Sequence, residues 1–148
     1  MTSLTLALVM HATLAGPVDN YAVAYKQMKE EGKPLVVLVG APWCPACQQM
    51  SQGTIPQAKK QGMFQNVAYA YVNSDNDPEL ANRLLSGRAI PQLIMFHNSP
   101  EGWKRQQLIG AQSTSSLQSF VNRGVESTAA AAAKTKLASQ PVEETQPK

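Results

Sequence analysis

Hydrophobic residues recur along this chain in short blocks separated by turn-forming residues, and their spacing predicts the structure of each block. In the block over residues 21–31, apolar residues return every three or four positions: Tyr21, Ala24, Tyr25 and Met28. This spacing predicts one buried face of a helix. Asn20 is a good N-cap for that helix, and Gly32, followed by Pro34, is a good stop.

The later blocks predict strands and helices in alternation. The continuous apolar run Leu35–Val39 is typical of a strand buried on both faces. Further strands are predicted at residues 67–72, 92–96 and 104–109. Helices are predicted after Cys47, over residues 79–85, and from a cap at Ser113 or Thr114 to a stop at Gly124.

The connections between these elements predict the fold class. Strands separated by helices must run parallel, whereas strands joined by the predicted turn at residues 98–102 must run antiparallel. We therefore expect an α/β fold with a mixed central sheet of four to five strands and helices on both faces.

The N-terminal segment, residues 1–16, has two interpretations. Leu4–Met10 is apolar and is followed by small residues that a signal peptidase could cut, but no Lys or Arg precedes Lys26. We favour a signal peptide and export, for example to a periplasm, over a first strand in a cytoplasmic protein. The apolar run is shorter than the about 20 residues that span a membrane, so we expect no stable membrane insertion.

The C-terminal segment, residues 125–148, has a different composition from the rest. An alanine run is followed by residues rich in Ser, Gln, Pro, Glu and Lys, which cannot supply a core. We expect a flexible low-complexity tail here, with the alanine run extending the last helix by a turn or two. The folded domain is then expected over residues 17–124.

Composition and charge exclude several classes of protein. The chain has 148 residues, of which 43% are hydrophobic and 16% charged, with a net charge of +3, as expected for one globular domain. The basic residues are scattered and aromatic residues are only 6%, so we expect no nucleic-acid partner. A zinc site needs about four ligands. Besides the two cysteines the chain offers only His11 and His97, which lie far from them in the sequence, so a zinc site is not expected. We expect no metal and no other cofactor.

The two cysteines, Cys44 and Cys47, come directly after a predicted strand and at the start of a predicted helix. With Cys44 as the N-cap, Pro45 takes the first helical position, where its missing N–H costs nothing. The N–H groups of Ala46 and Cys47 would then point at the Cys44 sulfur, and the helix dipole would add partial positive charge. Both effects favour the thiolate, which predicts Cys44 as the attacking thiol and Cys47 as the resolving one.

Other roles for the cysteine pair stay open at this point. A structural disulfide or an inert pair is one alternative, although so short a loop constrains little entropy of the unfolded chain. A c-type haem site would need histidine after the second cysteine, where Gln48 stands. The main hypothesis is an oxidoreductase acting on protein disulfides. The alternative is a binding or scaffold module whose cysteine pair is structural or regulatory.

These pieces together resemble the thioredoxin superfamily over roughly residues 17–124. The resemblance rests on four segments, Lys33–Val39, Ala41–Cys47, Ile90–Pro91 and Ile109–Ala111. It implies that Cys44 is the nucleophile, Cys47 the resolving cysteine and Trp43 the tryptophan beside the site. It also implies that the substrates are protein thiols and disulfides and that another dithiol protein donates or accepts the electrons. We expect a monomer.

The resemblance also assigns a substrate groove. It implies that Pro91 is a cis-proline facing the cysteines, that the backbone of Ile90 binds a peptide, and that Gly110 is a small residue in the groove. The alternative for Pro91 is an ordinary trans proline at the start of a strand, since only about 5–6% of such bonds are cis. The alternative for Trp43 is packing alone.

Two departures from the thioredoxin pattern concern the redox chemistry. Thioredoxins proper have a buried aspartate six residues before the first cysteine, where this chain has Leu38, so another base or water must serve. Pro45-Ala46 replaces their Gly-Pro, and Ala46 keeps an N–H that could bond to the Cys44 sulfur. A second donor would stabilise the reduced form and predicts a potential less reducing than about −270 mV.

Overall fold

The computed structural model describes residues 19–139 of the chain, so the N-terminal segment of residues 1–16 lies outside the described residues. The elements follow in the order α1 (Tyr21–Glu31), β1 (Leu35–Gly40), α2 (Pro45–Gln48), η1 (Gln49–Thr54), α3 (Ile55–Lys60), β2 (Ala68–Asn73), α4 (Pro78–Leu84), β3 (Gln92–Ser99), β4 (Gly102–Ile109) and α5 (Thr114–Ala138).

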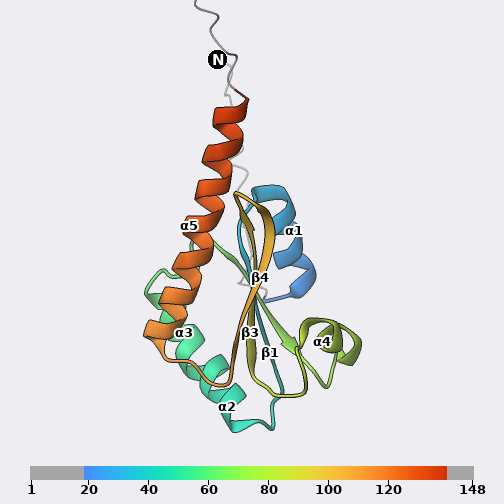
Figure 1. Cartoon of the computed structure of the whole chain (residues 1–148). Helices are drawn as coiled ribbons and strands as arrows, with labels where there is room; N and C mark the ends of the chain where they lie inside the picture. Colours follow the sequence, from blue (N-terminus) through green and yellow to red (C-terminus); the bar gives the residue numbers. More distant parts are fainter. Residues whose placement is uncertain (1–18, 140–148) are drawn as a thin grey trace, which may run out of the picture.

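The strands form one mixed sheet in the order β2-β1-β3-β4 (Figure 1). β1 is parallel to β2 and antiparallel to β3, and β3 is antiparallel to β4. In this register Leu38 of β1 lies between Tyr71 of β2 and Leu93 of β3. Four strands within the described residues agree with the predicted mixed sheet.

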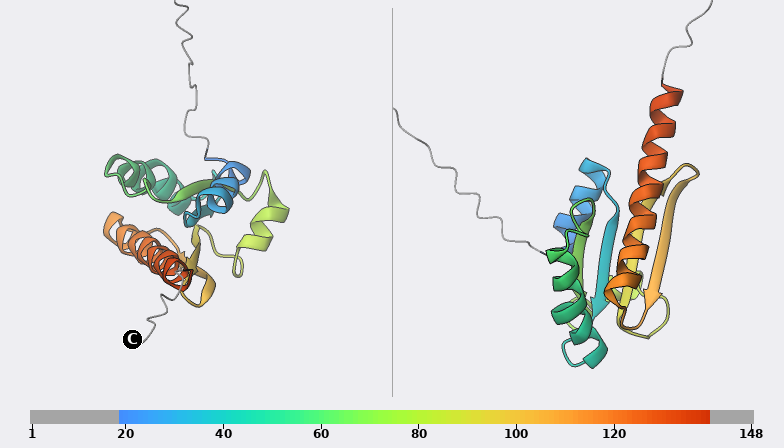
Figure 2. Two further views of the ribbon diagram at one scale, coloured as in Figure 1. Left: turned by 90° about the horizontal axis from the view of Figure 1, so that it is seen from above. Right: turned by 90° about the vertical axis from the view of Figure 1, so that its left-hand side faces the viewer.

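Helices cover both faces of the sheet, as predicted (Figure 2). α1 and α4 pack on one face, where Ala24, Met28 and Leu84 meet Val37 and Ile94. The π-helical segment η1, α3 and α5 cover the other face, where the buried side chains include Val36, Leu38, Met50, Leu93 and Phe120. Every residue of β1 is buried, because this central strand is covered on both sides.

Local signals determine where α1 begins and ends. The Asn20 side chain accepts hydrogen bonds from the backbone N–H groups of Ala22 and Val23. Gly32 ends the helix in the left-handed conformation, at φ 68°, which glycine adopts without the steric cost of a side chain. Both predicted caps of this helix are confirmed.

The helical segment after Cys47 changes its hydrogen-bonding pattern between α2 and α3. In η1 the backbone closes a π-helical turn, and the N–H of Ile55 donates to the carbonyl of Met50. Pro56 follows directly; it has no N–H, and in a regular helix its ring would clash with the carbonyl four residues earlier. The wider turn accommodates this proline while keeping Met50 and Ile55 in the core.

The last helix is longer than expected, and the prediction of a helix stop at Gly124 is wrong. α5 continues through Gly124 to Ala138, so the helical part of the expected tail is ordered, while residues 140–148 lie outside the described residues. Gly124 is buried against β3, where a Cβ would overlap the side chain of Met95. The alanine run then continues the helix because alanine has the highest helix propensity.

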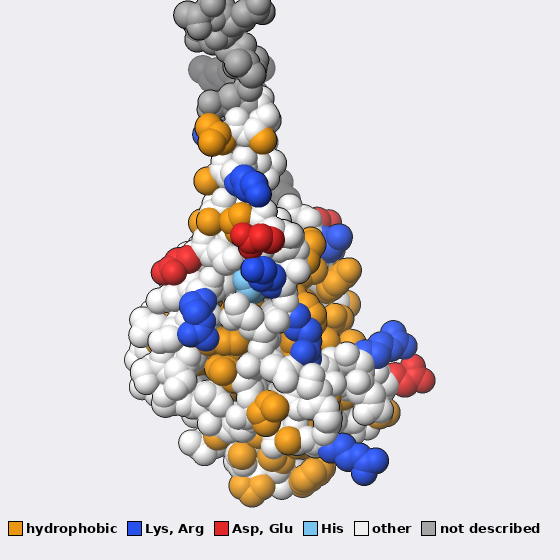
Figure 3. All heavy atoms as spheres, viewed as in Figure 1, with side chains coloured by type: hydrophobic (Ala, Val, Ile, Leu, Met, Phe, Trp, Pro, Cys, Tyr) orange, Lys and Arg blue, Asp and Glu red, His pale blue; other side chains and the backbone are white. Residues whose placement is uncertain are grey.

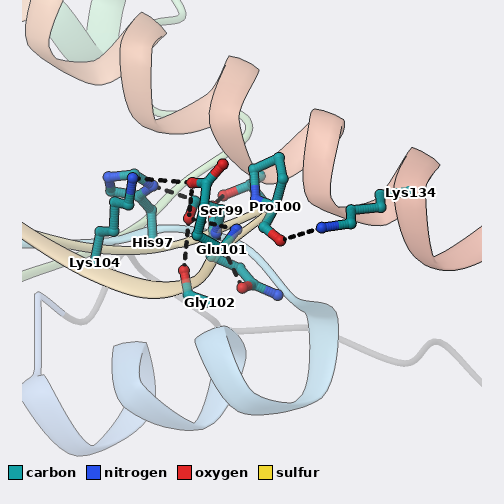
Figure 4. Close-up of polar contacts among 9 residues, drawn as sticks. His97, Ser99, Pro100, Glu101, Gly102, Lys104 and Lys134 are labelled. Atoms are coloured by element: carbon teal, nitrogen blue, oxygen red, sulfur yellow. Dashed lines mark hydrogen bonds and ion pairs between the residues drawn. The ribbon is translucent and has the colours of Figure 1, made fainter.

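The added turns of α5 are fastened to the β3–β4 hairpin. Lys134 Nζ donates to the carbonyl of Pro100 over 2.8 Å (Figure 4), and Thr128 Oγ1 donates to the carbonyl of Asn98 over 3.4 Å. The hairpin is tighter than predicted, because the strands pair as far as Ser99 and Gly102. Within residues 19–139, no helix is long and apolar enough to cross a membrane.

Candidate dithiol site

The Cys44 sulfur sits at the start of α2 and acts as its N-cap. The backbone N–H of Cys47 donates a hydrogen bond to this sulfur over 3.2 Å, and Pro45 occupies the first helical position. The hydrogen bonds of residues 19–139 include none from the Ala46 N–H, so the predicted second donor is not observed. One backbone donor and the start of a helix therefore face the Cys44 sulfur.

Cys47 is the more deeply buried cysteine of the pair. Its side chain is 1% exposed, against 6% for Cys44, and both are free thiols. Burial raises the pKa of Cys47 to about 11, with a further contribution from the Cys44 sulfur beside it. Cys47 therefore holds its proton at neutral pH, which suits a thiol that reacts second.

Ile90 and Pro91 lie next to the cysteines although they are far away in the sequence. Cys44 Sγ is 3.9 Å from the carbonyl oxygen of Ile90, and Ile90 packs against the small cluster of Ala41, Cys44 and Cys47. The Ile90–Pro91 peptide bond is cis, as the resemblance implied.

Gly110 borders the same site from the end of β4. Its N–H donates to the carbonyl of Pro91 over 2.8 Å, and its φ of 84° lies in the left-handed region. Gln112 continues the loop back to the cysteine-bearing helix, where its carbonyl accepts a 3.0 Å hydrogen bond from Thr54 Oγ1. The structure thus places the Ile90–Pro91 segment beside Cys44 and Gly110 beside Pro91.

Trp43 is 68% exposed, and a hydrogen bond orients its ring. Trp43 Nε1 donates to Asp75 Oδ2 over 3.0 Å. Asp75 lies in the turn after β2. No local signal distinguishes Asp75 from its neighbours in that turn, because its partner is on another loop.

The surface around the cysteines is apolar and carries few charges. Trp43 and Ile109 are among its exposed large hydrophobic residues, and hydrophobic side chains gather at the end of the molecule where α2 lies (Figure 3). Residues 40–58 and 106–122, which border the site, include no Lys, Arg, Asp or Glu. Within residues 19–139, no group of three or more His, Cys, Asp or Glu side chains could hold a metal ion.

Comparison with solved structures shows the same fold in several thioredoxins. The thioredoxin from Thermus thermophilus superposes with a TM-score of 0.58 at 20% identity, covering 70% of this chain and 82% of that one. Chloroplastic thioredoxin z gives a TM-score of 0.60 at 16% identity, covering 76% and 97%. Fasciola hepatica thioredoxin gives 0.54 at 23% identity, covering 72% and 96%.

Comparison of the sequence itself gives the family. No curated protein sequence matches the chain. The family model described as Thioredoxin matches residues 18–123, which include the cysteine pair, the cis-proline and Gly110. This match covers more than half of the chain, and we conclude that the chain belongs to the thioredoxin family.

Proposed function

We propose that this protein is a thiol–disulfide oxidoreductase that exchanges disulfides with protein substrates through Cys44 and Cys47. The observation that carries the proposal is the position of the Cys44 sulfur. It accepts the Cys47 N–H over 3.2 Å at a helix start and lies 3.9 Å from the Ile90 carbonyl. A sulfur capped by a backbone N–H at a helix start suits a nucleophile, and the Ile90–Pro91 segment beside it suits a peptide substrate.

The exchange has two steps. The Cys44 thiolate attacks one sulfur of a substrate disulfide, forms a mixed disulfide and releases the other sulfur as a thiolate. Cys47 then loses its proton and attacks the Cys44 sulfur, which breaks the mixed disulfide. The electron pair of the broken bond leaves with the substrate sulfur, which takes up a proton. The substrate is reduced by two electrons, and the protein ends with a Cys44–Cys47 disulfide.

The substrate would bind mainly through its backbone. The Ile90–Pro91 segment lies beside the sulfur, Gly110 is hydrogen-bonded to Pro91, and the exposed Trp43 directly precedes Cys44 in the chain. An extended peptide can pair with such an edge while contributing little side-chain specificity. Electrons would come from or go to another dithiol protein, and the protein would act as a monomer.

Dithiothreitol-driven reduction of insulin tests the proposal. The wild-type protein should accelerate insulin precipitation, and Cys44→Ala should lose this activity. Cys47→Ala should accumulate a mixed disulfide with the substrate that non-reducing electrophoresis detects. Ser51→Ala, which changes a partly buried residue of the same helical segment outside the pair, serves as the control. Absence of both activity and trapped adducts would favour a binding or scaffold module.

We also propose export of the protein through removal of residues 1–16. The apolar run and the small residues after it support this proposal. N-terminal sequencing of the mature protein tests it: a start near residue 17 supports export, and an intact Met1 contradicts it.

A further inference from the structure

The resolving step requires Cys47 to lose its proton to a nearby acceptor or relay. This side chain is 1% exposed, and its thiol keeps the proton at neutral pH. The neighbouring core on this face of the sheet is apolar and includes Leu38 and Met50, neither of which can accept a proton. A polar group close to Cys47 is therefore needed for rapid deprotonation.

Tyr71 lies near the Cys47 sulfur, on the other side of the space that Gly40 leaves open. A Cβ atom placed on Gly40 would be 3.0 Å from Cys47 Sγ and 3.7 Å from Cε2 of the Tyr71 ring. The sulfur and the ring edge therefore flank the same small space, which exists because residue 40 has no side chain. Tyr71 is half-buried and packs against the apolar core of this face, opposite Leu38.

The electrostatic surroundings of Tyr71 agree with this placement. Burial raises the pKa of the Tyr71 phenol, and the charges of Cys47, Cys44 and Asp75 raise it further. The phenol is therefore a neutral hydroxyl within electrostatic range of both sulfurs at neutral pH. Tyr69 points to the same face two residues earlier, but the charge that most affects its pKa is Asp19, and its ring lies under Lys59.

We propose that the Tyr71 hydroxyl relays the proton of Cys47 to solvent during the resolving step, an inference that rests on the proposed function. The hydroxyl oxygen takes the proton from the Cys47 sulfur as the hydroxyl gives its own proton to water, so Tyr71 ends unchanged. The freed electron pair of Cys47 forms the bond to the Cys44 sulfur.

Stopped-flow reaction with a chromogenic aromatic disulfide separates the two steps. The full-length reduced protein should release one coloured thiolate when Cys44 attacks, at a rate proportional to reagent concentration. It should release a second when Cys47 resolves the adduct, at a concentration-independent rate. Tyr71→Phe removes only the hydroxyl and should slow the second phase about 100-fold near neutral pH, the lower end of the range for lost proton-transfer assistance. The first phase should change less than about two-fold.

The pH profile distinguishes a relay from a structural effect. In Tyr71→Phe the deficit should shrink as pH approaches about 11, where Cys47 loses its proton directly to hydroxide. Added imidazole buffer should accelerate the second phase of this variant and leave the wild type unchanged. Tyr69→Phe, the matched control on the same strand and face, should retain both phases.

Three outcomes would overturn the proposal: an unchanged second phase in Tyr71→Phe, a deficit equal at every pH, or no response to imidazole. Absence of the first phase in the wild type would instead contradict the proposed function. If Tyr71→Phe failed to fold, Tyr71→His would decide, because an imidazole can also carry a proton. It should keep a second phase faster than that of Tyr71→Leu.

Discussion

Gly124 of α5 packs directly against Met95 of β3, and a Cβ at position 124 would overlap the sulfur and methyl group of the methionine. Met95 is fully buried, so any shift of its thioether end takes place inside the packed core. This contact explains why a glycine occurs inside a helix of 25 residues. Glycine has no side chain and therefore lets α5 approach β3 most closely at position 124.

Gly124→Ala should lower the free energy of unfolding. Overpacking a core costs about 1–3 kcal/mol, and the gain in helix propensity returns at most about 1 kcal/mol, so we expect a net loss of about 1 kcal/mol. Urea unfolding measures it. The double variant Gly124→Ala/Met95→Ala should be more stable than the sum of the single effects predicts. Purely additive effects would show that a Cβ at position 124 does not overlap the Met95 side chain.

Gly40→Ala should damage the resolving step more than the attacking step. The new methyl group would lie 3.0 Å from both Cβ and Sγ of Cys47, closer than ordinary contact, and would displace the buried cysteine. We expect a stability loss of about 1–3 kcal/mol and accumulation of the mixed disulfide, measured by mass spectrometry. Gly53→Ala is the control, because a Cβ there meets nothing within 4 Å. Equal behaviour of the two variants would contradict this explanation.

The raised pKa of Cys47 predicts a pH-dependent stability for the reduced protein. The folded thiol has a pKa of about 11 against an ordinary 9.0, so the native state keeps a proton that the unfolded chain loses. Its contribution is complete below about pH 9 and is lost as pH rises to about 11. Urea midpoints of reduced wild type should therefore fall more steeply over this range than those of Cys47→Ala. Parallel pH curves would argue against a buried, protonated Cys47.

His97 should be replaceable by an apolar residue with a gain in stability. Within residues 19–139, its Nε2 is the one buried side-chain nitrogen or oxygen without a hydrogen-bond partner, while Nδ1 lies 3.1 Å from the carbonyl of Asn98. His97→Leu removes the unpartnered atom and should raise the free energy of unfolding by about 1 kcal/mol. Thermal melts measure it. His97→Gln keeps a buried polar group and should not share the gain; a loss in both variants would indicate a hydrogen bond to water.

Local signals predicted much of the fold, because caps and hydrophobic periodicity depend on neighbouring residues. Asn20 and Gly32 delimit α1 as expected, and Cys44 caps α2 as expected. The predicted stop at Gly124 is wrong because an isolated glycine near the end of a pattern resembles a stop. Its actual role depends on Met95, a contact that only the folded chain creates.

The same distinction holds for the site. The cysteine spacing and the Ile-Pro dipeptide were recognisable in the sequence, and the structure places them in contact. Asp75 and Tyr71 carry no such signal, because Asp75 lies in an ordinary turn and Tyr71 in an ordinary strand. Their proximity to the cysteines follows from the pairing of β1 with β2, which no local pattern encodes.

The length of α5 has a practical consequence for handling the protein. Its 25 residues form a rod of roughly 37 Å, and its far end stands at the opposite pole from the cysteine-bearing helix (Figure 1). A fluorophore, a resin or a fused domain coupled at Ala138 would therefore face away from the thiols. The Cys44–Cys47 dithiol of such an immobilised protein would remain accessible to macromolecules in solution.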